Sequence, residues 1–152
     1  IGSDKRLDVL LRAVAMLKTA IPIRVALYGE GDDEHDLRAL ASGLGLDGRV
    51  DFLGVAKDVW AAYDAMDIVV LCSPRESSSN MVLEAMAAAK AIVVSRAGGS
   101  PELVDQGQCG LCVPPLDGEL LSTLLERLVA SPELSRHLGQ RREQRHEDLF
   151  LR

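Results

Sequence analysis

One stretch decides the fold: Ile68-Val-Val-Leu-Cys-Ser-Pro-Arg-Glu-Ser-Ser-Ser-Asn-Met-Val-Leu-Glu-Ala-Met-Ala87. It begins with an apolar run typical of a buried strand and ends in a run that favours a helix. The polar loop between them carries one carboxylate, Glu76, and the helix carries another, Glu84. A strand, a loop and a helix in this order present free backbone N–H groups and a positive helix end. Both features suit a phosphate.

Around this unit the chain alternates further strands and helices. Strands are predicted at residues 23–28, 50–53, 68–72, 91–95 and 110–113. Helices are predicted at 4–19, 33–43, 58–66 and 80–89, then as a short helix ending at 105, and at 118–130 and 132–150. The first helix should be capped by Asp4, and the third should bury Val59, Ala62 and Tyr63. This alternation predicts an α/β domain with one parallel sheet flanked by helices and right-handed crossovers.

The composition sets the broad class of the protein. At 152 residues the chain suits a single domain, and 47% apolar residues argue against disorder. A net charge of −6 disfavours nucleic acid as a partner, since phosphate contacts need clustered cations. No apolar run approaches the roughly 20 residues of a membrane span. The chain opens at Ile1 rather than at a methionine, so we expect an excised or processed piece.

Three cysteines, Cys72, Cys109 and Cys112, indicate a reducing compartment, so a cytoplasmic protein is expected. Cys109 and Cys112 have the C-x-x-C spacing of a redox or metal-binding pair. No second pair completes a zinc site. We therefore interpret them as small buried hydrophobic residues.

Four loops follow predicted strands: Gly29-Glu-Gly31, Gly54-Val55, residues 74–80 and Gly98-Gly99. Because the carboxyl ends of parallel strands share one edge, these loops should converge on a single site. The first loop is not a dinucleotide fingerprint, since Glu34 stands where a third glycine is needed. A tight turn that lets a ligand approach the backbone is the better interpretation.

The two carboxylates of the opening stretch allow several roles. A glycosidase-like pair would place Glu76 and Glu84 across one bond at about 5–10 Å. A metal site would need further ligands, and none accompanies the pair. The pair could instead recognise two hydroxyl-bearing parts of one ligand, as acidic residues do for a ribose. An exposed glutamate near a helix start remains the alternative for Glu84.

The pattern Glu76-x7-Glu84 resembles the carboxylate motif of retaining family-four glycosyltransferases. The resemblance covers nearly the whole chain and includes Tyr28-Gly-Glu-Gly31, Phe52-Leu-Gly54, Asp67-Ile-Val-Val-Leu71, Gly98-Gly-Ser-Pro-Glu102 and Gly110-Leu-Cys-Val-Pro-Pro115. It implies the GT-B architecture of two Rossmann-like domains. Residues 1–152 would then be the C-terminal, donor-binding domain, truncated at both ends and without its N-terminal acceptor domain.

The resemblance also implies roles for individual residues. Glu76 would face the donor sugar near the reacting carbon, and Glu84 would bind the ribose hydroxyls. Lys5 and the helix dipoles would neutralise the diphosphate, so no metal or other cofactor is expected. The backbone from Ser78 to Val82 would hold the sugar and the diphosphate. The predicted donor-binding residues are Lys5, Gly29, Val55, Asp58, Ser77, Ser78, Ser79, Asn80, Met81, Val82 and Glu84.

The chain departs from the family pattern at a few positions. Ser77-Ser-Ser79 replaces a glycine-rich segment, and serine resists the positive φ that glycine accepts. Ala89 stands where glycine is common, and Ala91 where proline is common. Both replacements are interpreted as conservative for packing.

The implied activity is transfer of a hexose from a nucleotide-diphosphate sugar to a hydroxyl acceptor, with retention. The isolated domain should be inactive. A GT-B nucleotide-sugar epimerase and a non-catalytic nucleotide-binding or receiver module are the alternatives. The last helix carries Arg136, Arg141, Arg142 and Arg145, and it could face a partner domain or an acidic membrane surface. A solvated face is favoured.

Overall fold

The computed structural model describes residues 1–75, 80–104 and 109–140, and its strands form two parallel sheets. In the first, β1 (Val25–Tyr28) pairs with β2 (Val50–Gly54). In the second, β3 (Ile68–Leu71), β4 (Ala91–Ser95) and β5 (Leu111–Val113) lie in the order β3-β4-β5. The predicted α/β fold of parallel strands is confirmed. The predicted single sheet is wrong, because no ladder joins the two sheets within the described residues.

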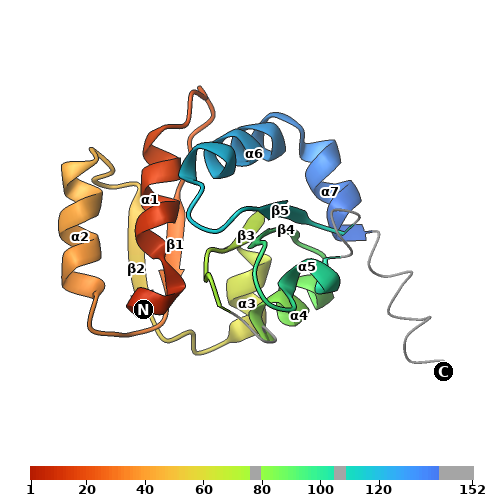
Figure 1. The fold of residues 1–152 in the computed structure, drawn as a ribbon, viewed down its shortest axis with the longest axis horizontal. Coiled ribbons are helices and arrows are strands. Elements are labelled where there is room, and N and C mark those ends of the chain that lie inside the picture. The colour runs from red at the N-terminus through yellow and green to blue at the C-terminus, as the bar shows by residue number, and fades with distance from the viewer. Residues whose placement is uncertain (76–79, 105–108, 141–152) are drawn as a thin grey trace.

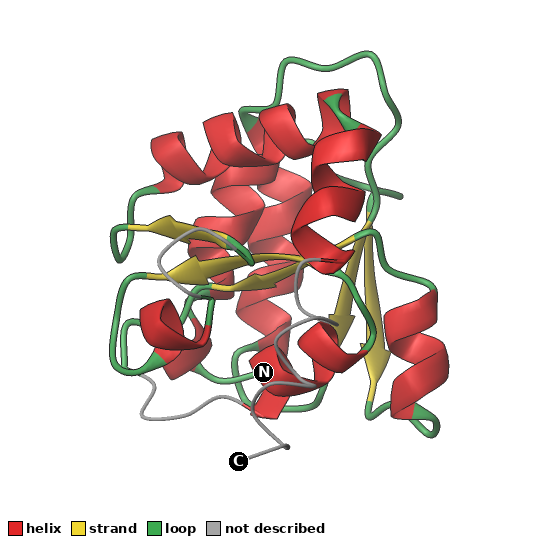
Figure 2. Ribbon diagram, turned by 90° about the vertical axis from the view of Figure 1, so that its right-hand side faces the viewer, coloured by secondary structure: helices red, strands yellow, loops and turns green. Residues whose placement is uncertain are grey.

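Helices cover both sheets. A short 3-10 helix, η1 (Ser3–Lys5), opens the chain. The α-helices are α1 (Leu7–Ala15), α2 (Glu34–Gly43), α3 (Val59–Asp64), α4 (Asn80–Ala87), α5 (Ser100–Leu103), α6 (Gly118–Ala130) and α7 (Pro132–Gln140). Figure 1 shows α6 and α7 on one side of β4 and β5, with α4 and α5 on the other. Figure 2, turned by 90°, shows the two sheets set at an angle to each other.

Strand β4 lies at the centre of the packing. All five of its residues are buried, and successive side chains enter different cores. Ala91 and Val93 join the core that β1, α1 and α6 line, whereas Ile92 and Val94 join the core beneath α4. A parallel strand covered on both faces is nearly continuous in apolar residues, as Ala91 to Val94 are here, with the buried Ser95 at its end.

The first predicted helix, residues 4–19, is interrupted. Arg6 lies between η1 and α1 in the left-handed conformation, with φ 49°, and α1 ends at Ala15. Asp4 lies inside η1, so its predicted capping role is wrong. The Arg6 side chain instead donates two hydrogen bonds to Asp8, each 2.9 Å long, across the interruption.

Two other predicted helices differ in detail. Asp58 caps α3 by accepting a hydrogen bond from the Ala61 N–H at 3.0 Å, and Tyr63 is buried as expected. Val59 is 42% exposed, so its predicted burial is wrong. It is the first residue of α3, and its side chain lies at the exposed start of the helix. Helix α7 extends to Gln140, and the rest of the predicted helix 132–150 lies outside the described residues.

Ala89, in the turn from α4 to β4, has φ 54°. Glycine occupies that conformation without strain, whereas a Cβ makes it unfavourable. The interpretation of Ala89 as a neutral replacement was therefore incomplete, because it considered packing and not the backbone. Helix α7 packs tightly on this turn, since a Cβ built on Gly139 would lie 2.0 Å from the Ala89 carbonyl oxygen.

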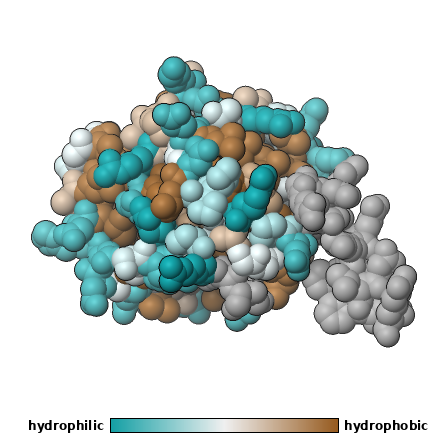
Figure 3. Space-filling model, in the orientation of Figure 1, coloured by the Kyte–Doolittle hydropathy of each residue, from teal (hydrophilic) through white to brown (hydrophobic). Residues whose placement is uncertain are grey.

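On the face drawn in Figure 3, hydrophilic and hydrophobic residues are intermixed. None of the described helices combines the length and the hydropathy needed to cross a membrane.

Candidate functional site

The centre of the candidate site is Glu84, one turn into α4. This helix buries Val82 and Ala85 and leaves Glu84 half-buried at its margin. The Tyr63 hydroxyl, from α3, donates to Glu84 Oε2 at 3.0 Å and also lies 3.3 Å from the Met81 carbonyl oxygen. Burial, followed by the hydrogen bond to Glu84, raises the pKa of Tyr63 well above its ordinary value. The hydroxyl therefore keeps its proton, and Glu84 is the acceptor.

Glu84 Oε1 has no hydrogen-bond donor among the described residues. A carboxylate with one oxygen held and the other available can accept from the vicinal hydroxyls of a ribose. The ribose-binding role of Glu84 stays a prediction. The alternative was an exposed glutamate near a helix start, whereas Glu84 is half-buried and bonded to Tyr63.

The start of α4 supplies backbone groups rather than side chains. Asn80 is exposed, Met81 is half-buried, and the Val82 side chain is fully buried in the core beneath α4. The first N–H groups of a helix have no acceptor within the helix and point at an anion placed there. Any contribution of Val82 to a ligand therefore comes from its backbone.

Lys5 ends η1, and its ammonium lies 3.4 Å from the carboxylate of Asp4. The next residues, Arg6 and Asp8, lie close enough to the end of β3 for their charges to act on the thiol of Cys72. Burial, with Asp8 adding to it and Arg6 opposing it, raises the pKa of that thiol to about 12. Since β3 leads towards α4, the start of the chain and the start of α4 share one edge of the fold.

Gly29, Val55 and Asp58 follow the ends of β1 and β2. The Gly29 N–H donates to the Gly54 carbonyl at 2.7 Å, which ties the two strand ends together, and Gly29 has φ 110°. Val55 is 66% exposed beside this tie. Asp58 already caps α3, so a contact between its carboxylate and a ligand would have to share that oxygen or use the other one.

The predicted tight turn at Gly29 to Gly31 is displaced, since the turn lies at Asp32 and Asp33. The chain's own first residue packs against Gly29 and Gly31. A Cβ on Gly31 would lie 2.0 Å from the Ile1 carbonyl oxygen, and the Ile1 amino group donates to the Glu30 carbonyl. The close approach that requires Gly31 is therefore made by protein backbone here.

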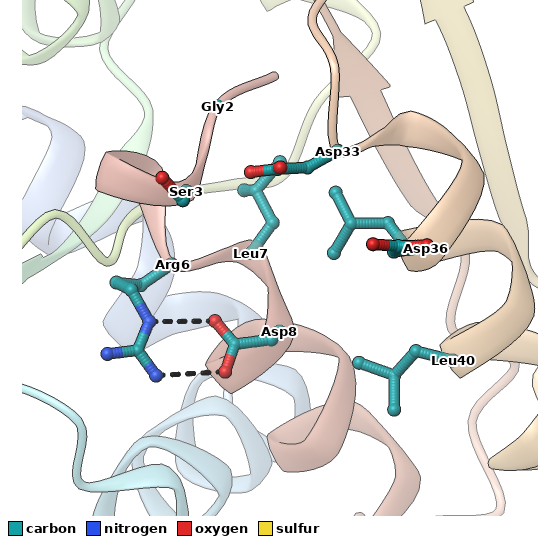
Figure 4. Close-up of a pocket in the computed structure, with 9 residues that line it drawn as sticks. Gly2, Ser3, Arg6, Leu7, Asp8, Asp33, Asp36 and Leu40 are labelled. Atoms are coloured by element: carbon teal, nitrogen blue, oxygen red, sulfur yellow. Dashed lines mark hydrogen bonds and ion pairs between the residues drawn. The ribbon is translucent and has the colours of Figure 1, made fainter.

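A hollow of about 300 Å³ lies between the starts of α1 and α2 (Figure 4). Three carboxylates line it, from Asp8, Asp33 and Asp36. Arg6 is the one cationic side chain that the described residues contribute, and it is paired with Asp8. Like charges repel a diphosphate. We therefore do not assign the donor to this hollow.

Some predicted site residues cannot be placed. Glu76, Ser77, Ser78 and Ser79 lie outside the described residues.

Cys72, Cys109 and Cys112 are free thiols. The first two are buried, and burial raises the pKa of Cys112. The described parts of the chain contain no group of three His, Cys, Asp or Glu residues able to hold a metal ion.

The model of the family described as glycosyl transferases group 1 matches residues 1–145. The chain belongs to this family. Among its relatives are the putative glycosyltransferase EpsD of Bacillus subtilis, 34% identical, and the lipopolysaccharide core biosynthesis glycosyltransferase LpsE of Rhizobium meliloti, 32% identical. Each match covers 90% of this chain and 36% or 39% of the relative. The chain thus spans less than half the length of these two relatives.

Solved structures agree with this family assignment. Sucrose-phosphate synthase from Thermosynechococcus elongatus superposes with a TM-score of 0.88 at 27% identity, covering 98% of this chain and 39% of that one. HepE from Anabaena, solved in complex with UDP, gives 0.83 at 26% identity, covering 91% and 39%. The C-terminal domain of the group 1 protein LpcC from Francisella tularensis gives 0.81 at 26%, covering 92% and 76%. The described domain has the fold of one half of a GT-B glycosyltransferase.

Sequence reasoning missed Tyr63 as a site residue and assigned it to the core alone. Its core position is correct, since it is only 6% exposed. The available signal was the hydroxyl, because a buried tyrosine hydroxyl normally requires a hydrogen-bond partner.

Proposed function

We propose that this chain is the donor-binding domain of a glycosyltransferase that moves a hexose from a nucleotide-diphosphate sugar to a hydroxyl acceptor, with retention. The observation that carries the proposal is Glu84, held through Oε2 at the start of the helix that follows β3. HepE, solved with UDP and with UDP-glucose, supports a ligand of this class.

In the proposed complex the ribose hydroxyls donate to Glu84, and the first turn of α4 faces the diphosphate. Charge that develops on the leaving diphosphate is stabilised by Lys5 and the N–H groups of Asn80, Met81 and Val82. Glu76 faces the sugar near the reacting carbon. These groups stabilise the leaving group by fixed dipoles and one ammonium, so we propose that no metal is required.

The acceptor and the other half of the cleft come from a second domain in this proposal, so the 152-residue chain binds donor without transferring sugar. We also propose a cytoplasmic location, on the grounds of the free cysteines.

Calorimetric titration of the chain with UDP, GDP and ADP tests the proposal. One of these should bind, and Glu84→Ala should weaken its binding by about 1–3 kcal/mol through loss of charge-assisted hydrogen bonds. Ser135→Ala, which removes a hydroxyl bond to the Leu128 carbonyl between α6 and α7, is the control and should leave affinity unchanged. Unaltered affinity of Glu84→Ala would refute the ribose role. Sugar transfer by the chain alone would refute the need for a second domain.

A further inference from the structure

We propose that Tyr63 is a positioning residue for the ligand: its hydroxyl fixes the Glu84 carboxylate through Oε2 and so keeps Oε1 for the ribose. This inference rests on the proposed function and adds to it a residue from a different helix. Tyr63 lies in α3 and Glu84 in α4, 21 residues apart, and they meet through a hydrogen bond of 3.0 Å.

The geometry identifies Glu84 as the main acceptor. A hydroxyl has one hydrogen to donate, and two oxygens lie near it, Glu84 Oε2 at 3.0 Å and the Met81 carbonyl at 3.3 Å. A bond to a carboxylate is shorter and about twice as strong as one to a neutral carbonyl. Both acceptors belong to the first turns of α4, so the hydroxyl contacts the helix at its ligand-facing end.

The tyrosine is itself held firmly. Its ring is part of the core beneath α4, with Val82 and Ala85 in the same cluster. Trp60, one turn earlier in α3, lies beside it, with ring centroids 6.5 Å apart and a tilt of 52°. A tyrosine fixed on several sides has few rotamers left to lose, whereas the half-buried glutamate has three side-chain torsions to restrain. The rigid partner therefore restrains the flexible one.

The protonation of the pair favours a constant geometry. Burial and the neighbouring carboxylate raise the pKa of Tyr63, so the hydroxyl stays a donor throughout the neutral and mildly alkaline range. Loss of the phenol proton therefore does not change the positioning in that range.

Tyr63→Phe tests the proposal, because it keeps the ring and removes only the hydroxyl. Calorimetry measures the affinity of the 152-residue chain for the nucleoside diphosphate that binds best among UDP, GDP and ADP. The same titrations are made with its 2′-deoxy and 3′-deoxy analogues. The variant should bind the ribonucleotide about three- to tenfold more weakly, and its preference for the ribonucleotide over the deoxy analogues should shrink.

A purely structural role gives a different result. If Tyr63 only supported the fold, Tyr63→Phe would lower the affinity for all three ligands by one factor, or for none, and the preference would be unchanged. That outcome overturns the proposal. Ser135→Ala loses a hydroxyl bond remote from α4 and should leave both affinity and preference unaltered.

A second variant tests whether Tyr63 acts through Glu84 or independently of it. In a chain carrying Glu84→Gln, Tyr63→Phe should have little further effect on the deoxy preference, since both act through one carboxylate. A full additional effect would show that Tyr63 acts independently of Glu84 and would overturn the proposal. Failure of the unmutated chain to bind any of the three diphosphates would refute the proposed function itself. Binding with an intact preference in Tyr63→Phe would refute only the positioning role.

Discussion

Replacing Gly139 by alanine adds one methyl group where α7 meets the turn between α4 and β4. The added carbon would lie 2.0 Å from the Ala89 carbonyl oxygen and 2.8 Å from its carbonyl carbon. Since non-bonded carbon atoms rest about 3.5–4.0 Å apart, α7 or the turn must move by more than about 1 Å. Because the atoms met are backbone rather than the end of a flexible side chain, we expect a loss near the upper end of overpacking costs, about 3 kcal/mol.

Thermal unfolding followed by circular dichroism measures this effect. For a domain of this size a loss of 3 kcal/mol lowers Tm by roughly 6–12 °C. Gly43→Ala is the matched control, since Gly43 also lies in a helix and nothing stands within 4 Å of the added carbon. That variant should gain about 0.5–1 kcal/mol. If both variants melt within a degree of the unmutated chain, the close contact between α7 and the Ala89 turn does not exist in solution.

Three further outcomes are expected. Ala89→Gly should stabilise the chain by about 1 kcal/mol, because it removes the strain of a Cβ at φ 54°; a lower Tm would contradict this. Asp58→Ala should lower the free energy of unfolding, measured in urea, by about 1 kcal/mol through loss of the α3 cap. Asp58→Asn should retain most of that stability. Since the folded state raises the pKa of Cys72 from 9.0 to about 12, it holds the thiol proton more tightly than the unfolded chain. Stability should therefore fall as pH rises above 9, with a shallower slope in Cys72→Ala.

Periodicity predicted most of the elements, since each depends on short-range pattern. The apolar run at residues 91–94 predicted a strand at 91–95, and the structure confirms it. Helix α1 buries Leu10, Leu11 and Val14 at helical spacing, within the predicted helix 4–19. The interruption at Arg6 was missed because arginine is a good helix former, and only its contacts with Asp8 and the backbone after η1 reveal the left-handed turn.

The ligand role of Glu84 stays a prediction. Its position on the helix after β3 could be predicted, because it depends on chain order alone. Its bond with Tyr63 joins two helices that no local pattern connects. The division into two sheets has the same origin, because strand pairing is a property of edges in space rather than of the sequence within a strand.

The two sheets are held together by packed side chains, and the strength of this packing depends on temperature. Leu27 of β1 and Val93 of β4 belong to one core, while no backbone ladder crosses between their sheets in the described residues. Hydrophobic attraction weakens on cooling, whereas each sheet is also held by the backbone hydrogen bonds of its ladders. Cold should therefore loosen the joint between the sheets before it loosens either sheet.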